Sequence, residues 1–65
     1  MNQMARKEDF DDLHPEQQAR IIALLHTLIE QRLSCRFEMV GADFTCVVGQ
    51  GHASPKFWAD KFDIT

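Results

Sequence analysis

A long apolar run is missing from the sequence, which argues against a membrane protein. The longest apolar stretch, "IIALL", is far shorter than the roughly 20 residues that a transmembrane helix needs. The amino-terminal stretch "MNQMARKEDF" has no apolar segment either, so it does not resemble a secretion signal. We therefore expect a cytoplasmic protein that has no membrane partner.

Positive charge is also scarce. Seven Lys and Arg residues stand against ten Asp and Glu residues, which gives a net charge of −3. Among the basic residues, only Arg6 and Lys7 are adjacent. Non-specific binding of nucleic acid depends on a basic face that displaces counterions. We therefore expect no direct contact with nucleic acid.

Cysteine is limited to Cys35 and Cys46, in a chain of only 65 residues. A domain this small buries only about 60% of the surface of its unfolded chain, so many such domains rely on disulfides, a metal or self-association. Apolar residues nevertheless make up 45% of the chain, which is ordinary for a folded domain. We expect a single small domain over residues 1–65.

The strongest structural signal lies in "LHPEQQARIIALLHTLIEQRLS", whose apolar period predicts a helix over residues 15–33. Pro15 suits the first helical position, with His14 or Asp12 near the cap, and Gln17 can complete a weak capping box with residue 14. One face carries the apolar side chains Ile21, Ile22, Leu25, Leu28 and Ile29. Leu24 lies on the flank of this face, so the apolar surface of the helix is wider than packing on one side of the helix requires.

Residues 34–49 predict an antiparallel hairpin with a two-residue turn at Gly41-Ala42, where glycine suits the first position of a type II′ turn. If Val40 pairs with Asp43, alternation along both strands sorts the side chains onto two faces. The apolar face receives Cys35, Phe37, Met39, Phe44, Cys46 and Val48, and the other face receives Arg36, Glu38, Thr45 and Val47. A shift of one residue destroys this sorting, so the turn and the register support each other.

In the tail, Ser54-Pro55 resembles a helix cap followed by a first helical residue, which predicts a short helix over residues 55–62. Trp58 and Phe62 then lie one turn apart and close one end of the core. The alternative is a third strand in which Trp58, Phe62 and Ile64 share a face; we favour the helix. A two-stranded sheet alone is barely stable, so the long helix must cover it. The predicted fold class is α+β, in the order α-β-β-α.

The two cysteines are interpreted as small buried core residues. In the predicted register they are diagonal neighbours at roughly 7–8 Å, which is wider than disulfide geometry allows. A zinc site would draw on these cysteines and on His14, His26 and His52, but no close ligand pair is present among them. We therefore expect no disulfide, no metal and no cofactor.

No catalytic pattern stands out. The stretch "VVGQGHAS" follows a predicted strand and precedes a predicted helix, but it contains neither G-x-x-x-x-G-K-[ST] nor a complete G-x-G-x-x-G. A nucleophilic pair is conceivable between Cys46 and His26 or His52, yet the predicted register turns Cys46 toward the helix and away from solvent. We predict that the protein is not an enzyme.

The remaining signal is the stretch "KEDFDD", in which four carboxylates surround Phe10 within residues 7–12. One interpretation is a flexible, solvated arm over residues 1–12, because like charges repel and extend a chain. The other is a docking element in which Phe10 anchors on a partner inside an acidic rim. The candidate partner-binding residues are Glu8, Asp9, Phe10, Asp11, Asp12, Glu16, Trp58, Asp60 and Asp63, which form one surface if the tail lies near the N-terminal segment.

These features favour a small protein-binding regulator or inhibitor of the type found in phages and mobile elements. Its acidic surface would imitate nucleic acid and engage a basic site on a partner protein. The alternative is a structural module that forms a homodimer and uses Leu24, Val40 and Val47 as surplus apolar surface.

Overall fold

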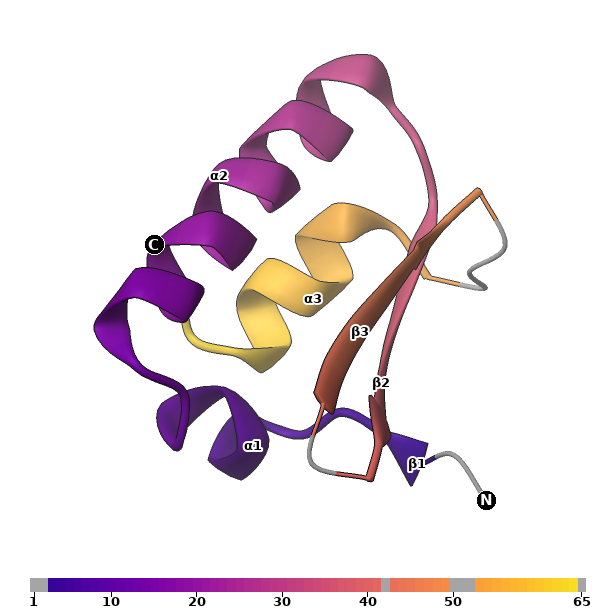
Figure 1. Cartoon of the computed structure of the whole chain (residues 1–65). Helices are drawn as coiled ribbons and strands as arrows, with labels where there is room; N and C mark the ends of the chain where they lie inside the picture. The colour runs from indigo at the N-terminus through magenta and orange to yellow at the C-terminus, as the bar shows by residue number, and fades with distance from the viewer. Residues whose placement is uncertain (1–2, 42, 50–52, 65) are drawn as a thin grey trace.

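The computed structural model describes residues 3–41, 43–49 and 53–64 of the chain. Over these residues the elements follow in the order β1 (Gln3–Met4), α1 (Lys7–Asp11), α2 (Pro15–Gln31), β2 (Cys35–Val40), β3 (Asp43–Val48) and α3 (Pro55–Lys61) (Figure 1). The α+β class is confirmed, as are the long helix, the hairpin and the short C-terminal helix. The sequence did not predict β1 and α1. None of the helices in these ranges is long and apolar enough to cross a membrane.

Helix α2 begins as predicted. Its cap is His14, whose backbone N–H donates to the Gln17 side-chain oxygen at 3.3 Å, and Pro15 is the first helical residue. The helix ends at Gln31, two residues before the predicted end, because Arg32 adopts a left-handed conformation with φ of 58°. Leu33 N–H then donates to the carbonyl oxygen of Leu28 at 3.0 Å and closes the turn.

The hairpin has the predicted register in every pair, from Val40 opposite Asp43 to Cys35 opposite Val48. Gly41 has φ of +64°, which suits the first position of a primed turn. Ala42 lies outside the described residues, so the turn type stays a prediction. The apolar face is covered most completely along β2, where Cys35 and Phe37 are fully buried.

Helix α3 confirms the predicted cap and rules out the alternative strand over this segment. The Ser54 hydroxyl accepts a hydrogen bond from Phe57 N–H at 3.2 Å, and Pro55 starts the helix. Trp58 and Phe62 are each 1% exposed. The indole N–H of Trp58 also donates to the carbonyl oxygen of Cys35 at 2.9 Å, which ties α3 to the start of β2.

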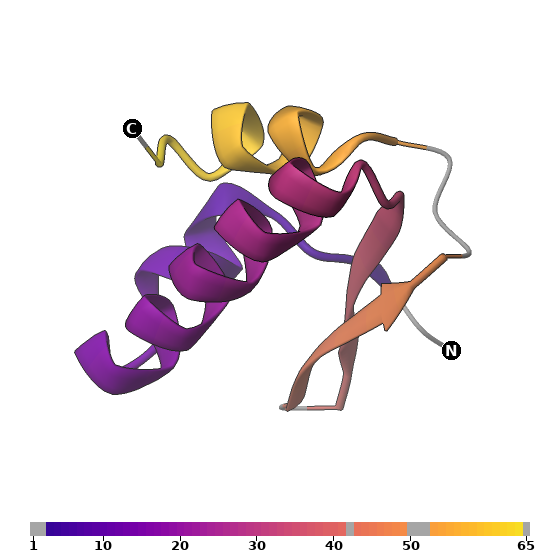
Figure 2. The ribbon, with the colours of Figure 1, turned by 90° about the horizontal axis from the view of Figure 1, so that it is seen from above.

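The helices and the hairpin enclose an aromatic core. Helix α3 packs against α2, and the twisted hairpin lies to one side of the two helices (Figure 2). The ring of Phe37 on β2 lies 5.4 Å from the ring of Trp58 and 5.5 Å from that of Phe62, both in edge-to-face geometry. The core therefore sits between β2 and α3, and Leu25 and Leu28 of α2 complete it.

The N-terminal segment belongs to this core, so the predicted flexible arm is wrong over residues 3–12. Strand β1 pairs antiparallel with β2, and Ala5 N–H donates to the carbonyl oxygen of Phe37 at 3.0 Å. Ala5 is fully buried and Phe10 is 7% exposed. Burial of these two side chains and the strand pairing offset the entropy lost by ordering a charged segment.

Candidate interaction surfaces

The acidic segment is helical, and one of its carboxylates serves as a cap. The Asp9 carboxylate accepts a hydrogen bond from Arg6 N–H at 2.9 Å. Its side chain is 20% exposed, far less than those of Glu8 and Asp11, which are 73% and 54% exposed. A carboxylate near a helix N-terminus is stabilised by the unpaired backbone N–H groups and by the helix dipole. The main role of Asp9 is therefore to cap α1, and its largely covered carboxylate adds less to the surface charge than Glu8 or Asp11.

The neighbouring carboxylates are partly neutralised. Lys7 Nζ lies 3.2 Å from Asp11 Oδ2, one helical turn away, and Arg6 Nε lies 3.7 Å from Glu8 Oε2. Exposed pairs of this kind contribute little to stability, but they reduce the local negative potential. Among the described residues, no ion pair involves Asp12, which leaves its charge uncompensated.

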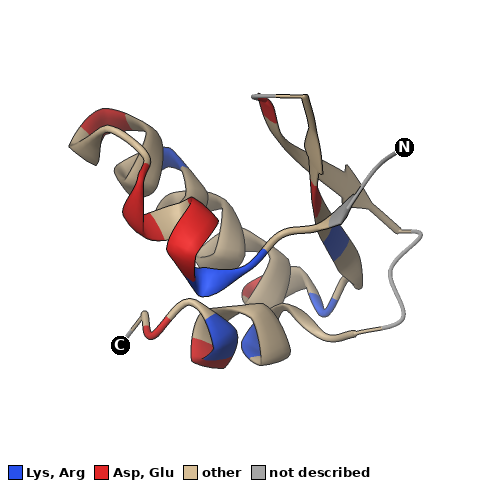
Figure 3. Cartoon of the chain, turned by 90° about the horizontal axis from the view of Figure 1, so that it is seen from below, with Lys and Arg blue, Asp and Glu red and all other residues tan. Residues whose placement is uncertain are grey.

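Two further carboxylates are brought beside α1 by an aromatic stack. The rings of Phe10 and Phe62 are nearly parallel, with centroids 5.2 Å apart. This contact holds α1 against the C-terminal end of α3, where Asp60 and Asp63 are exposed. Figure 3 shows the acidic segments of α1 and of the end of α3 next to one another, with basic segments of both helices among them. We call this surface the acidic face and define it as Glu8, Asp9, Asp11, Asp12, Asp60 and Asp63.

The two aromatic residues that the sequence assigned to partner binding are not on this face. Phe10 and Trp58 are 7% and 1% exposed and belong to the core. The predicted role of Phe10 as an exposed anchor is therefore wrong, whereas Trp58 lies in the core as predicted and does not offer its ring to a partner. In a domain this small, their rings stabilise the fold more when buried than when offered to a partner. Glu16, the remaining candidate, lies in the first turn of α2 with its carboxylate 3.8 Å from Arg20, and its side chain is 82% exposed.

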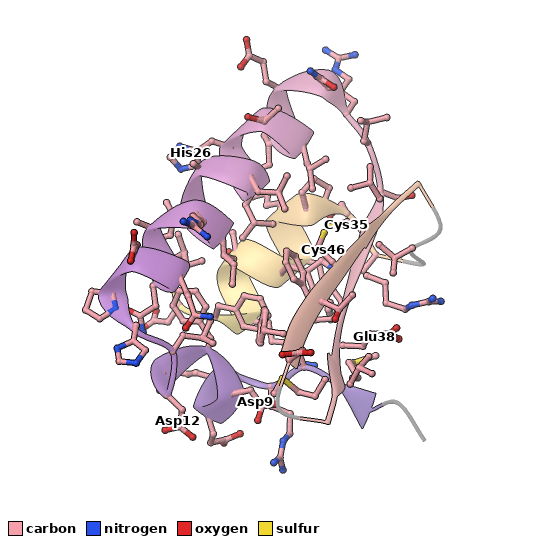
Figure 4. The ribbon with its side chains drawn as sticks, in the orientation of Figure 1. Asp9, Asp12, His26, Cys35, Glu38 and Cys46 are labelled. Atoms are coloured by element: carbon pink, nitrogen blue, oxygen red, sulfur yellow. The ribbon has the colours of Figure 1, made fainter. Side chains whose placement is uncertain are left out.

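The two thiols lie close to each other inside the fold, without a disulfide (Figure 4). Burial, followed by the neighbouring Cys46 thiol as a charge neighbour and hydrogen-bond partner, raises the pKa of the Cys35 thiol from 9.0 to about 11. Burial also raises the pKa of Cys46. A thiol with a raised pKa forms little thiolate near neutral pH, which disfavours nucleophilic chemistry here.

No cluster of three or more metal-ligating side chains is present among the described residues. His14 caps α2, while His26 lies on the side of α2 that faces away from the hairpin (Figure 4). His52 lies outside the described residues. The structure therefore does not bring His14 or His26 to the cysteines.

A free strand edge is the first feature that the sequence analysis missed. Over the residues that the structure describes, the sheet order is β1-β2-β3, so β3 is an edge strand. Gly49 N–H donates to the carbonyl oxygen of Ser34, and the alternation of an antiparallel ladder then turns the backbone groups of Phe44, Cys46 and Val48 outward. The strand has no Lys, no Pro and no bulge, which are the usual protections of an edge.

An apolar cleft is the second missed feature. It has a volume of about 440 Å³ and lies where the end of α2 meets the start of α3. Its lining consists of Ile29, Arg32, Leu33, Ser34, Ala53, Ser54, Pro55 and Lys56. The apolar period predicted a helix to residue 33, so the earlier end of α2 at Gln31, which leaves Leu33 in the connection to β2, could not be read from the sequence.

Comparisons with known proteins add no family to these observations. Neither the protein-family models nor the curated proteins and solved structures that were compared with the chain gave a match. The function is therefore argued from the geometry of the acidic face, the strand edge and the cleft.

Proposed function

We propose that this protein is a small, non-enzymatic regulator or inhibitor that binds a basic, nucleic-acid-binding site on a partner protein through its acidic face. The observation that supports the proposal is the stack of Phe10 on Phe62, because it holds α1, which carries Glu8, Asp9 and Asp11, against the end of α3, near Asp60 and Asp63. Clustered carboxylates raise the association rate with a basic partner and favour it over acidic ones.

The ordered backbone of α1 supports this proposal. A flexible acidic arm loses conformational entropy when it binds, whereas a helix that is already packed loses much less. Phe10 contributes by holding α1 in place and not by touching the partner. The carboxylates without an ion pair among the described residues, Asp12, Asp60 and Asp63, then supply most of the effective negative charge.

The proposed location is the cytoplasm, and the proposed mode of action is binding without catalysis. Both cysteines are free, which suits a reducing compartment. Their raised pKa values also disfavour a role as nucleophiles. The phage or mobile-element origin suggested by the composition is part of the same proposal.

Affinity capture from a lysate of the source organism tests the proposal. We expect the bound proteins to be basic and to bind nucleic acid, to elute with rising salt, and to be released by an excess of duplex DNA or of RNA. The diagnostic variant is Asp12→Asn/Asp63→Asn, in which Asn also suits the positive φ of residue 63. The matched control is Glu30→Gln/Asp43→Asn, which changes the net charge equally at sites away from the acidic face.

The two variants give a clear decision. The proposal predicts that Asp12→Asn/Asp63→Asn loses the captured proteins and that Glu30→Gln/Asp43→Asn keeps them. Equal loss in both variants would mean that net charge alone governs capture. Unchanged capture by both would remove the acidic face from the mechanism.

The second candidate function is a homodimerisation module, and the free edge of β3 favours it. Two copies of β3 can pair antiparallel around a twofold axis, so that the outward backbone groups of Phe44, Cys46 and Val48 find partners in the second copy. Val40 and Val48, which are 42% and 46% exposed, lie at the turn end of β2 and the far end of β3. Leu24, named earlier as surplus surface, packs partly against the core.

Sedimentation velocity over a range of concentrations tests this second candidate. A dimer is expected to form through β3 and to dissociate in Val48→Lys, because a charged side chain on an edge strand opposes strand pairing. Glu30→Lys, on the exposed side of α2, is the control for an added positive charge. A chain that stays monomeric at the highest concentration excludes this function.

A further inference from the structure

The apolar cleft is built by two stretches that are distant in the sequence, residues 29–34 and 53–56. The last turn of α2 supplies Ile29 and the connection to β2 supplies Leu33. The segment before α3 supplies Ala53, and the first residue of α3 is Pro55. Ile29 and Leu33 are 42% and 37% exposed, although both are large aliphatic residues. Their exposure means that the cleft is open to solvent and is not a filled part of the core.

The charge around this cleft has the opposite sign to that of the protein as a whole. Arg32 and Lys56 both line it, and no carboxylate does so among the described residues. Neither cation forms an ion pair with any described residue, whereas Arg6, Lys7 and Arg20 all do. In a chain with a net charge of −3, two unpaired cations beside an apolar cleft form a distinct local environment.

We propose that this cleft binds a peptide segment of a partner protein in which one or two large aliphatic side chains are flanked by carboxylates. The aliphatic side chains would contact Ile29, Leu33 and Ala53, and the carboxylates would pair with Arg32 and Lys56. The hydroxyls of Ser34 and Ser54 lie in the same lining and are able to hydrogen-bond to the peptide backbone.

The openness of the cleft favours a peptide over a small molecule. Sites for small ligands enclose most of the ligand surface, whereas here the main apolar residues remain more than a third exposed. A peptide inserts only its side chains and leaves its backbone in solvent. Charge complementarity selects the acidic flanks, and it also disfavours a basic peptide of the same hydrophobicity. This site is separate from the acidic face and does not depend on the function proposed for that face.

Titration of the ¹⁵N-labelled protein with three blocked pentapeptides tests the proposal by NMR. The peptide EDLLE is expected to shift the amide signals of Ile29, Leu33 and Ala53, with a dissociation constant of about 1 mM or tighter. The peptide EDAAE removes the aliphatic side chains, and KKLLK reverses the charge. Neither is expected to produce these shifts at the same concentration.

Two variants that change the net charge equally locate the binding site. Arg32→Asn/Lys56→Gln is expected to weaken EDLLE binding by about tenfold, and Asn tolerates the left-handed conformation of residue 32. Lys7→Gln/Arg20→Gln removes two cations outside the cleft and is expected to bind EDLLE like the unchanged protein. Circular dichroism establishes that both variants are folded.

Four outcomes would overturn the proposal. The first is the absence of cleft shifts with EDLLE up to about 5 mM, and the second is equal binding of KKLLK. The third is a shift of the cleft signals with protein concentration alone, which would identify a second copy of the chain as the occupant. The fourth is binding of decanoate without binding of EDLLE, which would identify a small-molecule site. Because none of the cleft substitutions touches the acidic face, failure here leaves the test of that face unaffected.

Discussion

Phe10 is the residue through which the N-terminal segment reaches the core. It is 7% exposed, and its ring stacks on that of Phe62 with centroids 5.2 Å apart. We expect Phe10→Ala to lower the free energy of unfolding by about 3–4 kcal/mol, because it removes the ring and leaves a void beside Phe62. Urea denaturation followed by Trp58 fluorescence measures this loss.

Phe57 provides the matched comparison for Phe10. Its side chain is 46% exposed and contacts the edge of Trp58 and the ammonium group of Lys61. We expect Phe57→Ala to cost about 1 kcal/mol or less, as is usual for a surface substitution with few contacts. Equal losses for the two variants would contradict the assignment of Phe10 to the core.

The thiol of Cys35 predicts a loss of stability at alkaline pH. Its pKa is raised from 9.0 to about 11 by burial and by the adjacent Cys46. Above pH 9.0 the unfolded chain releases this proton while the folded chain retains it, so the unfolded state binds fewer protons. The free energy of unfolding must then fall as pH rises from 9 toward 11, by an amount of the order of 1–2 kcal/mol.

Substitution of Cys35 separates this effect from the titration of lysines, which occurs in the same pH range. In Cys35→Ala, the free energy of unfolding should fall less between pH 9 and 11 than in the unchanged protein, whatever its value at pH 7. Urea denaturation at a series of pH values under reducing conditions measures both slopes. Parallel slopes would show that the Cys35 thiol ionises as readily in the folded state as in the unfolded one.

At the scale of elements, the hairpin depends on the turn residue Gly41. Its φ is +64°, and a Cβ atom added there would meet no other atom within 4 Å. The cost of Gly41→Ala is therefore conformational and not steric, about 1 kcal/mol. For a domain of this size, that corresponds to a fall in melting temperature of roughly 4–8 °C.

Gly41→Asn distinguishes the conformational cost from a general effect of substitution at the turn. Asn adopts positive φ more readily than Ala, so its melting temperature should lie between those of Gly41→Ala and the unchanged protein. Thermal denaturation followed by circular dichroism ranks the three proteins. If Ala and Asn lowered the melting temperature equally, backbone conformation at residue 41 would not be the cause.

The elements that could be predicted from the sequence are those with a local signal. Helix α2 has an apolar period over many residues, the hairpin has a turn glycine and consistent alternation, and Ser54-Pro55 marks the start of α3. Strand β1 has only two residues and α1 only five, so neither is long enough to show a period. Both exist because of contacts with distant residues, namely the pairing of β1 with β2 and the packing of Phe10 on Phe62.

The candidate surfaces were predictable to a smaller extent. The sequence identified the carboxylates and the condition under which Asp60 and Asp63 would join the N-terminal cluster. The Phe10–Phe62 stack brings the two segments together, and a shared acidic surface stays a prediction. The sequence misplaced Phe10, because periodicity cannot assign a lone aromatic to core or surface, whereas it placed Trp58 correctly at one end of the core. The cleft was not predictable, since it depends on where α2 ends and on how the segment before α3 returns to it.

At the scale of the whole molecule, we expect folding to depend on the N-terminal segment. Residues 1–13 contain Ala5, Phe10 and the β1 pairing with β2, and Leu13 packs partly against the core. A domain of this size has little stability to spare. We expect the chain that lacks residues 1–13 to lose more than about 4 kcal/mol, and with it cooperative unfolding in urea and the near-ultraviolet circular dichroism of Trp58.

A charge-matched variant shows whether packing or charge causes this loss. Residues 1–13 carry two cations and four carboxylates, so their deletion changes the net charge by the same amount as Glu8→Gln/Asp12→Asn. That double variant keeps the Phe10 stack and both backbone segments, so it should unfold cooperatively with a urea midpoint close to that of the unchanged protein. A truncated chain with the same midpoint would instead show that residues 1–13 are dispensable for folding. The acidic segment would then be better described as a flexible arm.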